Sequence, residues 1–453
     1  MSGLPEGWKL AEFAELLAVE GVFSDGDWVE SKDQDPNGVI RLLQLADIGD
    51  GKFLNKSNRF INGTTFEELR CTELAKNDVL IARMPDPLGR ACLMPEFPLR
   101  CITVVDVAVF RPGKSGVEPR WLMHSVNAPQ FRAQIEANAS GTTRKRISRG
   151  NLAKLSLPVP PRSEQKRIAD KLDSVLARVD ACRDGLDRIP ILLKRFRQSV
   201  LAAATTGRLT EGWREEKHLE WKPGHHCVAD LGDVVTGNTP SKREAVAYGG
   251  TIPFYKPSDL DVGYRVESAS EYLTEVGAGM ARLLPERTVL VTCIGATIGK
   301  TGLSRRSGAT NQQINAVVCN ENVIPEWLFF WFTGPYGQAA ITRNASATTL
   351  PILNKSKFGS LRLEVPAIAE QHEIVRRVET LFAFADRLEA RCAAARKQAG
   401  QLTPALLAKA FRGELVPQDP ADEPAAELLK RLAARRAEAP KARRGKPRVS
   451  TGG

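Results

Sequence analysis

The stretch CIGATIGKT (293–301) contains the residues of this sequence whose types and spacing come nearest to a catalytic motif. A glycine-rich turn ending in Gly-Lys-Thr could hold phosphates with its backbone N–H groups, as P-loops do. A P-loop, however, needs a glycine five residues before Gly299, and that position is Ile294. No apolar run ending in an acidic metal ligand stands out downstream. The spacing therefore argues against an ATPase, and the Gly-Lys pair needs another explanation.

Other reactive residue types lack the partners that their chemistry requires. The eight cysteines form no Cys-x-x-Cys pair, and His225-His226-Cys227 is the only cluster of potential metal ligands, so we interpret it as a loop without a metal. An amino-methyltransferase needs Asn/Asp-Pro-Pro-Tyr/Phe, but the nearest string, NAPQF (127–131), lacks the second proline. No nuclease set stands out either. We therefore expect no catalytic residues and no metal site.

Length and composition are those of a soluble globular protein. The 453 residues suffice for about three domains, and 42% are hydrophobic and 26% charged. No apolar stretch approaches the roughly 18 residues of a membrane helix, and the first residues lack an apolar signal core. With scattered cysteines, this pattern leads us to expect a cytoplasmic protein.

The net charge of +11 is concentrated near the end of the chain. Residues 430–453 hold nine Lys/Arg and one Glu, which is +8, so that the other residues carry +3. We expect a short helix and a basic, disordered tail after residue 416. If the folded part binds nucleic acid, it does so through local basic patches.

The sequence is a tandem duplication with a period near 206 residues. At that offset NASGTT (138–143) falls on NASATT (344–349), and LPVPPRSEQKRI (157–168) falls on LEVPAIAEQHEI (363–374). Such a period is too long for a solenoid, so a whole unit is repeated. We expect globular domains over 1–157 and 213–362 and helical spacers over 158–212 and 363–416.

Both spacers show the apolar spacing of four and three residues that is typical of a coiled-coil seam. In the first copy the seam positions are Ile168, Leu172, Val175, Val179, Cys182, Leu186, Ile189, Leu193, Phe196 and Val200. In the second copy they are Ile374, Val378, Leu381, Ala385, Leu388, Cys392, Ala395, Ala399, Leu402 and Leu406. We expect helices of roughly 63 Å at 1.5 Å per residue, kinked or interrupted at Pro190 and Pro404.

The order of the segments predicts how these helices pair. The first helix leaves the first globular domain and ends at the second, and the second helix starts there. Pairing therefore makes them antiparallel, with the two domains at opposite ends of a rod and related by a pseudo-twofold axis. Dimeric DNA-binding proteins hold two readers at a fixed spacing in a similar way. Because the two domains differ in sequence, we expect two different half-sites.

The globular domains are predicted to be mixed α/β or α+β structures with curved sheets. Short β-branched runs indicate strands, and we place them at 77–83, 102–110, 287–294 and 314–319. Apolar stretches at 119–137 and 325–342 indicate helices.

Candidate DNA contacts come as sets on equivalent segments. At an offset of 210, Gly89-Arg90 matches Gly299-Lys300, so the same turn carries a cation in both copies. The segments 141–149 and 349–357 are basic, and Asn311-Gln312-Gln313 supplies amides that can read adenine. For each residue singly, a solvated cation or a structural amide is an equally good interpretation. The candidates are Arg83, Arg90, Arg144, Lys145, Arg146, Lys256, Lys300, Asn311, Gln312, Gln313, Lys355 and Lys357.

The sequence resembles the specificity subunit of type I restriction-modification enzymes over nearly its whole length. The resemblance rests on several stretches, namely SDGDWVESKDQDPNGVIRLLQLADIGDG (24–51), VVTGNTPSKREAVAYGGTIPFYKPSDL (234–260), VLVTCIGATIGKTGL (289–303), VPPRSEQKRI (159–168) with VPAIAEQHEI (365–374), and AFRGELVPQD (410–419). The basic tail departs from the simplest form of the family.

The resemblance implies a subunit that is not catalytic by itself. Its two target-recognition domains would read a bipartite, asymmetric DNA site, and its helices would set the spacing and dock two modification subunits. Those subunits would methylate adenine with S-adenosylmethionine, and restriction subunits using ATP and Mg²⁺ would join them. Two alternatives are a coiled-coil scaffold that binds only proteins and a self-contained DNA methyltransferase.

Overall fold

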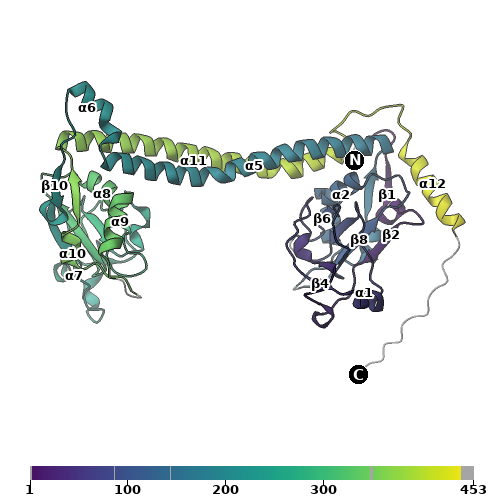
Figure 1. Ribbon diagram of the computed structural model, residues 1–453, viewed down its shortest axis with the longest axis horizontal. Coiled ribbons are helices and arrows are strands. Elements are labelled where there is room, and N and C mark those ends of the chain that lie inside the picture. Colours follow the sequence, from purple (N-terminus) through teal and green to yellow (C-terminus); the bar gives the residue numbers. More distant parts are fainter. Residues whose placement is uncertain (1–2, 86, 143, 347–349, 440–453) are drawn as a thin grey trace. The chain divides into compact units, whose positions relative to one another are not determined.

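The computed structural model describes residues 3–85, 87–142, 144–346 and 350–439. Contacts divide the chain into two compact units: residues up to 185 with those from 396 onward, and residues 186–395. Each unit contains a globular domain and parts of two long helices (Figure 1). Below, the first domain is the region 9–159 and the second domain is the region 224–365.

Three small sheets build the first domain. Strands β1 (Lys9–Glu12) and β9 (Ser156–Val159) pair antiparallel and bring the two ends of the domain together. The remaining strands form a four-stranded sheet in the order β2-β8-β5-β6 and a three-stranded sheet in the order β4-β3-β7. These strands are β2 (Val22–Asp25), β3 (Ile40–Leu43), β4 (Phe60–Ile61), β5 (Val79–Ala82), β6 (Ala91–Leu93), β7 (Cys101–Thr103) and β8 (Val107–Arg111).

The second domain repeats this topology strand for strand. Strands β10 (Gly224–Cys227) and β18 (Arg362–Val365) close it, and the two inner sheets have the orders β11-β17-β14-β15 and β13-β12-β16. The parallel pair β12–β16 corresponds to the parallel pair β3–β7. The bounds are β11 (Gly232–Thr236), β12 (Tyr248–Tyr255), β13 (Tyr272–Leu273), β14 (Val289–Thr292), β15 (Thr301–Leu303), β16 (Ala309–Thr310) and β17 (Ile314–Cys319). The predicted mixed α/β class and the internal repeat are confirmed.

Several predicted boundaries need correction. The predicted strand 102–110 is two strands, because the chain turns at 104–106, where the Val107 N–H donates to the Val104 carbonyl at 2.9 Å. The triplet 225–227, interpreted as a loop, lies in strand β10. The predicted domain ends at residues 157 and 362 fall inside β9 and β18.

Each predicted domain helix is also two helices. The segment 119–137 forms α2 (Pro119–Asn127) and α3 (Pro129–Ala137). The segment 325–342 forms α8 (Pro325–Thr333) and α9 (Pro335–Asn344). Proline has no N–H to continue a helix but fits its first position, so Pro129 and Pro335 each start a new helix.

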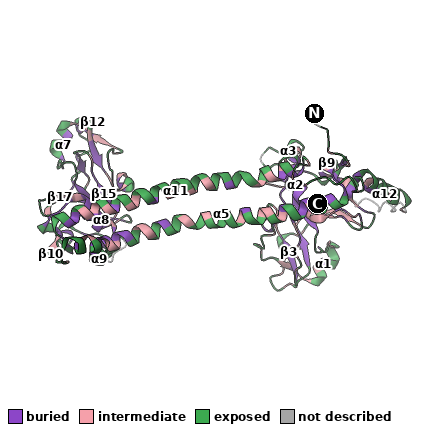
Figure 2. Cartoon of the chain, turned by 90° about the horizontal axis from the view of Figure 1, so that it is seen from above, coloured by how far each residue is buried: buried purple, intermediate pink, exposed green. Residues whose placement is uncertain are grey.

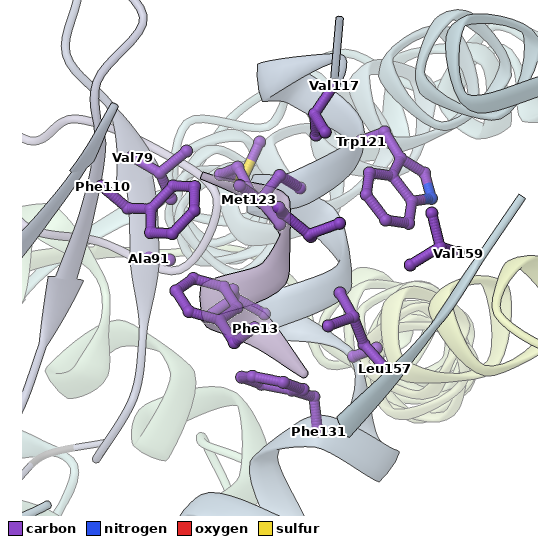
Figure 3. Packing of buried hydrophobic residues seen from close by; sticks show 14 of the residues in the cluster. Phe13, Val79, Ala91, Phe110, Val117, Trp121, Met123, Phe131, Leu157 and Val159 are labelled. Atoms are coloured by element: carbon purple, nitrogen blue, oxygen red, sulfur yellow. The ribbon is translucent and has the colours of Figure 1, made fainter. Parts of the chain in front are cut away.

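An aromatic cluster fills the space between the four-stranded sheet and the helices of the first domain. Figure 3 shows Phe13, Phe110 and Phe131 gathered there. The ring centroid of Phe13 lies 4.5 Å from that of Phe110 and 5.7 Å from that of Phe131. Trp121 on α2 is fully buried at the same core, and its counterpart on α8 is Trp327, which is 1% exposed. The repeated Pro-x-Trp-Leu sequence therefore encodes the packing of this helix against the sheet.

The repeated Glu-Gln pair explains how each long helix joins its domain. Gln165 is fully buried, accepts a hydrogen bond from the Glu118 N–H at 3.0 Å and donates to the Pro160 carbonyl at 3.0 Å. Gln371 does the same in the second unit, with the Ile324 N–H at 2.7 Å and the Pro366 carbonyl at 2.9 Å. In both units one side-chain amide links the long helix to the start of the domain helix.

The two long helices are α5 (Arg162–Thr205) and α11 (Ile368–Ala410). Both helices continue through their prolines, Pro190 and Pro404, which are exposed, so neither helix is interrupted there. The Gly400 carbonyl, which Pro404 leaves without its helical donor, accepts a hydrogen bond from Arg183 at 3.3 Å. In the first unit Arg183 donates to the Ala399 carbonyl at 2.8 Å, and in the second Arg197 reaches Asp386 at 2.7 Å. Further along the second unit Arg377 donates to the Leu209 carbonyl, just after α5, at 2.8 Å, so residue numbers fall in α11 as they rise in α5 and the helices pair antiparallel there. Figure 2 shows the two helices running side by side.

Most of the predicted seam positions lie on the less exposed side of these helices. Within the core clusters, Ile168, Leu172, Ile374 and Val378 are fully buried. Val179 and Ala385 are also buried, while Val175, Leu186, Leu381 and Leu388 are partly buried.

Two predicted seam positions are exposed: Cys182, and Leu402 with 47% of its surface exposed. At this end of α11 the buried residues are Ala399, Leu407 and Ala410. A straight helix with 3.6 residues per turn drifts away from a strict seven-residue repeat. The buried stripe therefore moves past Leu402, and the strict repeat predicted the wrong residue there.

Shorter helices complete the units. Helix α12 (Ala425–Glu438) buries Leu428 and Leu432 in the core of the first domain, and Arg436 donates to the carbonyls of Ala14 and Glu15. Of the basic tail predicted for 430–453, residues 430–438 belong to α12, and residues 440–453 lie outside the described residues. The other helices are α1 (Gly63–Leu69), α4 (Arg149–Ala153), α6 (Glu211–Lys217), α7 (Glu275–Met280) and α10 (Lys355–Gly359).

Candidate nucleic-acid interface

One edge of the four-stranded sheet gathers most of the predicted contact residues of the first domain. The ends of β2 and β5 pair with the start of β8, and the start of β6 pairs with β5 near its end. Two segments therefore meet at this edge of the sheet. One is the turn 83–90, which follows β5, and the other is Asp106, which directly precedes β8. A hairpin, formed by residues 140–142 and 144–146 on either side of the Ser140–Arg146 bridge, lies against this turn, because the adjoining Ile147 N–H donates to the Arg83 carbonyl at 3.2 Å.

The same edge exists in the second domain. The turn 293–300 follows β14, and the Leu353 N–H donates to the Cys293 carbonyl at 2.8 Å. Main-chain bridges join Ser140 to Arg146 in the first hairpin, and the Ser346 N–H donates to the Ile352 carbonyl at 3.0 Å in the second. The sequence pairs identified at offsets of 206 and 210 thus meet at one place in each domain.

The glycines of the two turns are required by the backbone. Gly89 has φ +77° and its N–H donates to the Ala82 carbonyl at 2.8 Å, while Gly299 has φ +84° and donates to the Thr292 carbonyl at 2.8 Å. A positive φ strains residues with a Cβ, and a Cβ at position 89 would lie 2.5 Å from Ile135. The Gly-Lys pair of CIGATIGKT therefore closes a strand-to-strand turn.

Two predicted contacts in the first domain are buried. Arg83 is 3% exposed, forms an ion pair with Asp25 at 3.0 Å and donates to the Val105 carbonyl, and burial lowers its pKa. Arg90 is 8% exposed and donates to the carbonyls of Leu45 at 2.8 Å and Ile48 at 2.5 Å. These contacts stabilise the sheet edge, and the expectation of surface cations at both positions needs correction.

Two predicted contacts of the second domain are more accessible, namely Lys300, which matches Arg90, and Lys256. The Lys300 ammonium lies 2.7 Å from Asp261, with the lysine side chain 24% and the aspartate side chain 72% exposed. Lys256 pairs with Glu271 at 2.8 Å, and its side chain is 33% exposed. Both ammonium groups lie at the surface with exchangeable acidic partners, a geometry that can shift to a phosphate.

The hairpin of the first domain carries three of its accessible cations. Arg144 and Lys145 are exposed. Arg146 is 42% exposed and lies 3.6 Å from Asp106. Arg149, at the start of α4, donates to the Phe23 carbonyl at 2.7 Å, which fixes the short helix on β2.

The second domain presents lysines on α10, the counterpart of α4, and amides before β17. Lys355 and Lys357 are exposed on α10. The side-chain amide of Asn311 donates to Gln313 at 3.0 Å, and Gln312 accepts a hydrogen bond from Thr239. These amides precede β17 directly and therefore lie at the same edge as Lys300.

Sequence reasoning missed one prominent residue, Trp28, which is 66% exposed. It borders a pocket of about 450 Å³ that also includes Gln44 and Asp106. Burial raises the pKa of Asp27, beside it, to about 6. The available signal was a tryptophan in the acidic loop DGDWVE (25–30), where no apolar periodicity accounts for it.

The fold and these surfaces define a class of protein in which two related domains on paired helices present similar polar, cationic surfaces. The chain carries two copies of one domain, each presenting cations and hydrogen-bonding side chains at the same sheet edge, and each copy is attached to a pair of antiparallel helices. Among the described residues, no helix has the length and apolar character needed to cross a membrane.

Comparison with known proteins identifies the family. The family model described as the type I restriction modification DNA specificity domain matches residues 5–186 and again residues 220–394. The chain therefore belongs to this family and contains its domain twice. As a member, it is a non-catalytic specificity subunit of the type I restriction-modification class.

Two individual relatives and one solved structure are consistent with this family. The EcoBI specificity subunit of Escherichia coli is 33% identical over 348 residues, covering 70% of this chain and 72% of the relative. The EcoKI specificity subunit of Escherichia coli K12 is 28% identical over 461 residues, or 96% of each chain. The HsdS crystal structure from Thermoanaerobacter tengcongensis has a TM-score of 0.62 at 18% identity, covering 91% of this chain and 98% of that one, and supports the fold.

Proposed function

We propose that each domain binds double-stranded DNA at the sheet edge described above and reads one half of a bipartite, asymmetric site. The observation that carries this proposal is a pair of exposed cations close to the sheet edge in each domain, Arg144 and Lys145 before α4 in the first domain and Lys355 and Lys357 on α10 in the second. Cations fix a protein on the phosphate backbone, while amides and other side chains beside them read bases.

The paired helices α5 and α11 would set the spacing between half-sites and dock two modification subunits. Adenine methylation with S-adenosylmethionine would belong to those subunits, and ATP- and Mg²⁺-dependent steps to restriction subunits. The complex would act in the cytoplasm. Family membership supports this division of labour.

Charge reversal in the complex with modification subunits tests DNA binding. We expect the double change R144E/K145E to weaken affinity for a duplex carrying the cognate site at least ten-fold and to reduce the slope of log K against log salt by about two, because each phosphate contact contributes about 0.9. K355E/K357E should do the same through the second domain.

Lys76→Glu is the matched control. Lys76 is exposed and pairs with Glu96 at 2.7 Å, and it precedes β5, whose other end meets the proposed interface. This variant should leave affinity and salt slope near wild type. Equal effects of all three reversals, or none from any, would contradict the proposed surface.

A further inference from the structure

The first domain holds a pocket beside its basic hairpin that none of the predicted contacts accounts for. Trp28 forms one wall, and its indole N–H donates to Glu30 at 3.2 Å while two thirds of the residue stays in solvent. Tryptophan offers a large apolar surface with a polar tip, and exposed tryptophans are enriched where proteins meet partners. The pocket volume of about 450 Å³ can accommodate a nucleobase edge.

Asp106 brings the pocket next to the cations. Its carboxylate is 29% exposed, lines the same pocket and lies 3.6 Å from Arg146 on the hairpin. A carboxylate accepts hydrogen bonds only, and at base edges its partner is the exocyclic amino group of cytosine. An acceptor for a base thus stands directly beside a cation for a phosphate.

The duplication gives an independent comparison for Trp28. The Gly26 N–H donates to the Val107 carbonyl at 2.8 Å, and the Gly237 N–H donates to the Ile314 carbonyl at 3.1 Å. These bonds join the end of one strand to the start of the same neighbouring strand in both domains. Two residues after each glycine stand Trp28 and Thr239, so the two occupy equivalent positions.

Asp106 has a polar but chemically different counterpart. It directly precedes β8, and Gln313 directly precedes β17. The Gln313 side-chain oxygen accepts a hydrogen bond from the Asn311 amide, and the Thr239 hydroxyl donates a hydrogen bond to Gln312. Where the second domain presents hydroxyl and amide groups, the first domain therefore presents an indole and a carboxylate.

We propose that Trp28 and Asp106 are specificity-determining residues of the first domain: Trp28 packs against a base in the groove, and Asp106 accepts a hydrogen bond from the amino group of a cytosine. This inference rests on the proposed function, because it assigns base readout to one part of the same interface. The equivalent Thr239 and Gln313 read the other half-site with hydroxyl and amide chemistry.

The test is a methylome of cells that carry the complete complex with variant chains. Asp106→Asn keeps the size of the side chain but adds donors and removes the negative charge. We expect this variant to tolerate or prefer another base at one former cytosine position in one half of the motif, with the other half unchanged. Trp28→Ala should lower methylation of cognate sites at least ten-fold in purified complex, and Trp28→Phe should recover part of that loss.

Thr239→Ala is the matched control, and it should affect the other half of the motif. If Trp28→Ala prevents assembly, Asp106→Asn and Trp28→Phe decide the question. Wild-type motif and rate in these variants would overturn the inference while leaving the proposed function intact. A wild-type complex that methylates no bipartite motif would instead refute the proposed function.

Discussion

Arg90 and Lys300 occupy the same position in equivalent turns, yet the Arg90 guanidinium is buried against carbonyls of its own domain while the Lys300 ammonium pairs with exposed Asp261 at 2.7 Å. In both turns the preceding glycine has a positive φ. The two domains thus share the backbone of this turn, but its cation is structural in the first domain and lies at the surface in the second.

This difference predicts unequal effects on stability. Arg90→Ala should lower the free energy of unfolding by on the order of 3 kcal/mol, because the buried carbonyls lose charge-assisted donors. Lys300→Ala should cost less than about 1 kcal/mol, as expected for a surface ion pair. Urea unfolding of the full chain measures both.

Lys300→Glu should weaken DNA binding by the complex without a comparable loss of stability. Equal destabilisation by Arg90→Ala and Lys300→Ala would contradict the structural role given to Arg90.

The architecture was predictable from the sequence because its signals are repeated. Apolar spacing located both long helices, and the match of 157–168 with 363–374 placed their starts at equivalent positions of the repeat. Pro129 and Pro335 divided the domain helices, which apolar content alone did not show. Leu402 was misplaced because a strict seven-residue repeat ignores the drift of a 3.6-residue helix.

The interface was harder to predict than the fold. Residue type and local charge singled out Arg83, but its burial depends on tertiary contacts with Asp25 on β2 and with the Val105 carbonyl in the turn before β8, both distant in sequence. Trp28 escaped notice for the complementary reason: an isolated tryptophan is usually part of a core, and only the fold shows that this one is exposed.

Glu164 and Glu370 are equivalent in the repeat but should respond oppositely to neutralisation. Glu370 pairs with the buried Arg214 and accepts from Thr210. Glu370→Gln should therefore cost about 3–5 kcal/mol, because it leaves a buried guanidinium uncompensated. Thermal or urea unfolding of the second unit would record the loss.

Glu164 accepts from the Trp8 indole N–H at 2.9 Å, and burial raises its pKa. A neutral side chain is favoured there, so Glu164→Gln should be neutral or stabilising by up to about 1 kcal/mol at pH 7. Strong destabilisation by this variant would show that its charge is needed.

The corrected seam predicts that truncating two leucines near the end of α11 will cost very different amounts of stability. Leu407 is 4% exposed within the core of the first unit, so Leu407→Ala should cost about 2–5 kcal/mol. Leu402→Ala should stay within about 0.5 kcal/mol, because its side chain is 47% exposed. Chemical denaturation of the two variants compares them directly, and the opposite ranking would restore the strict seven-residue seam.

Asp27 should make the stability of the first unit depend on pH. Burial raises its pKa from 3.8 to about 6, against the opposing hydrogen bond from the Thr72 N–H. Between these values the folded state binds more protons than the unfolded state, so the contribution of Asp27 to the free energy of unfolding falls as pH rises from about 4 to 6 and is constant above.

Asp27→Asn removes this dependence. The variant should therefore gain on the order of 1 kcal/mol relative to wild type between pH 5 and pH 8, allowing for solvent screening, and urea titrations across that range would reveal it. A difference between the two proteins that does not change with pH would show that Asp27 keeps an ordinary pKa in the folded chain.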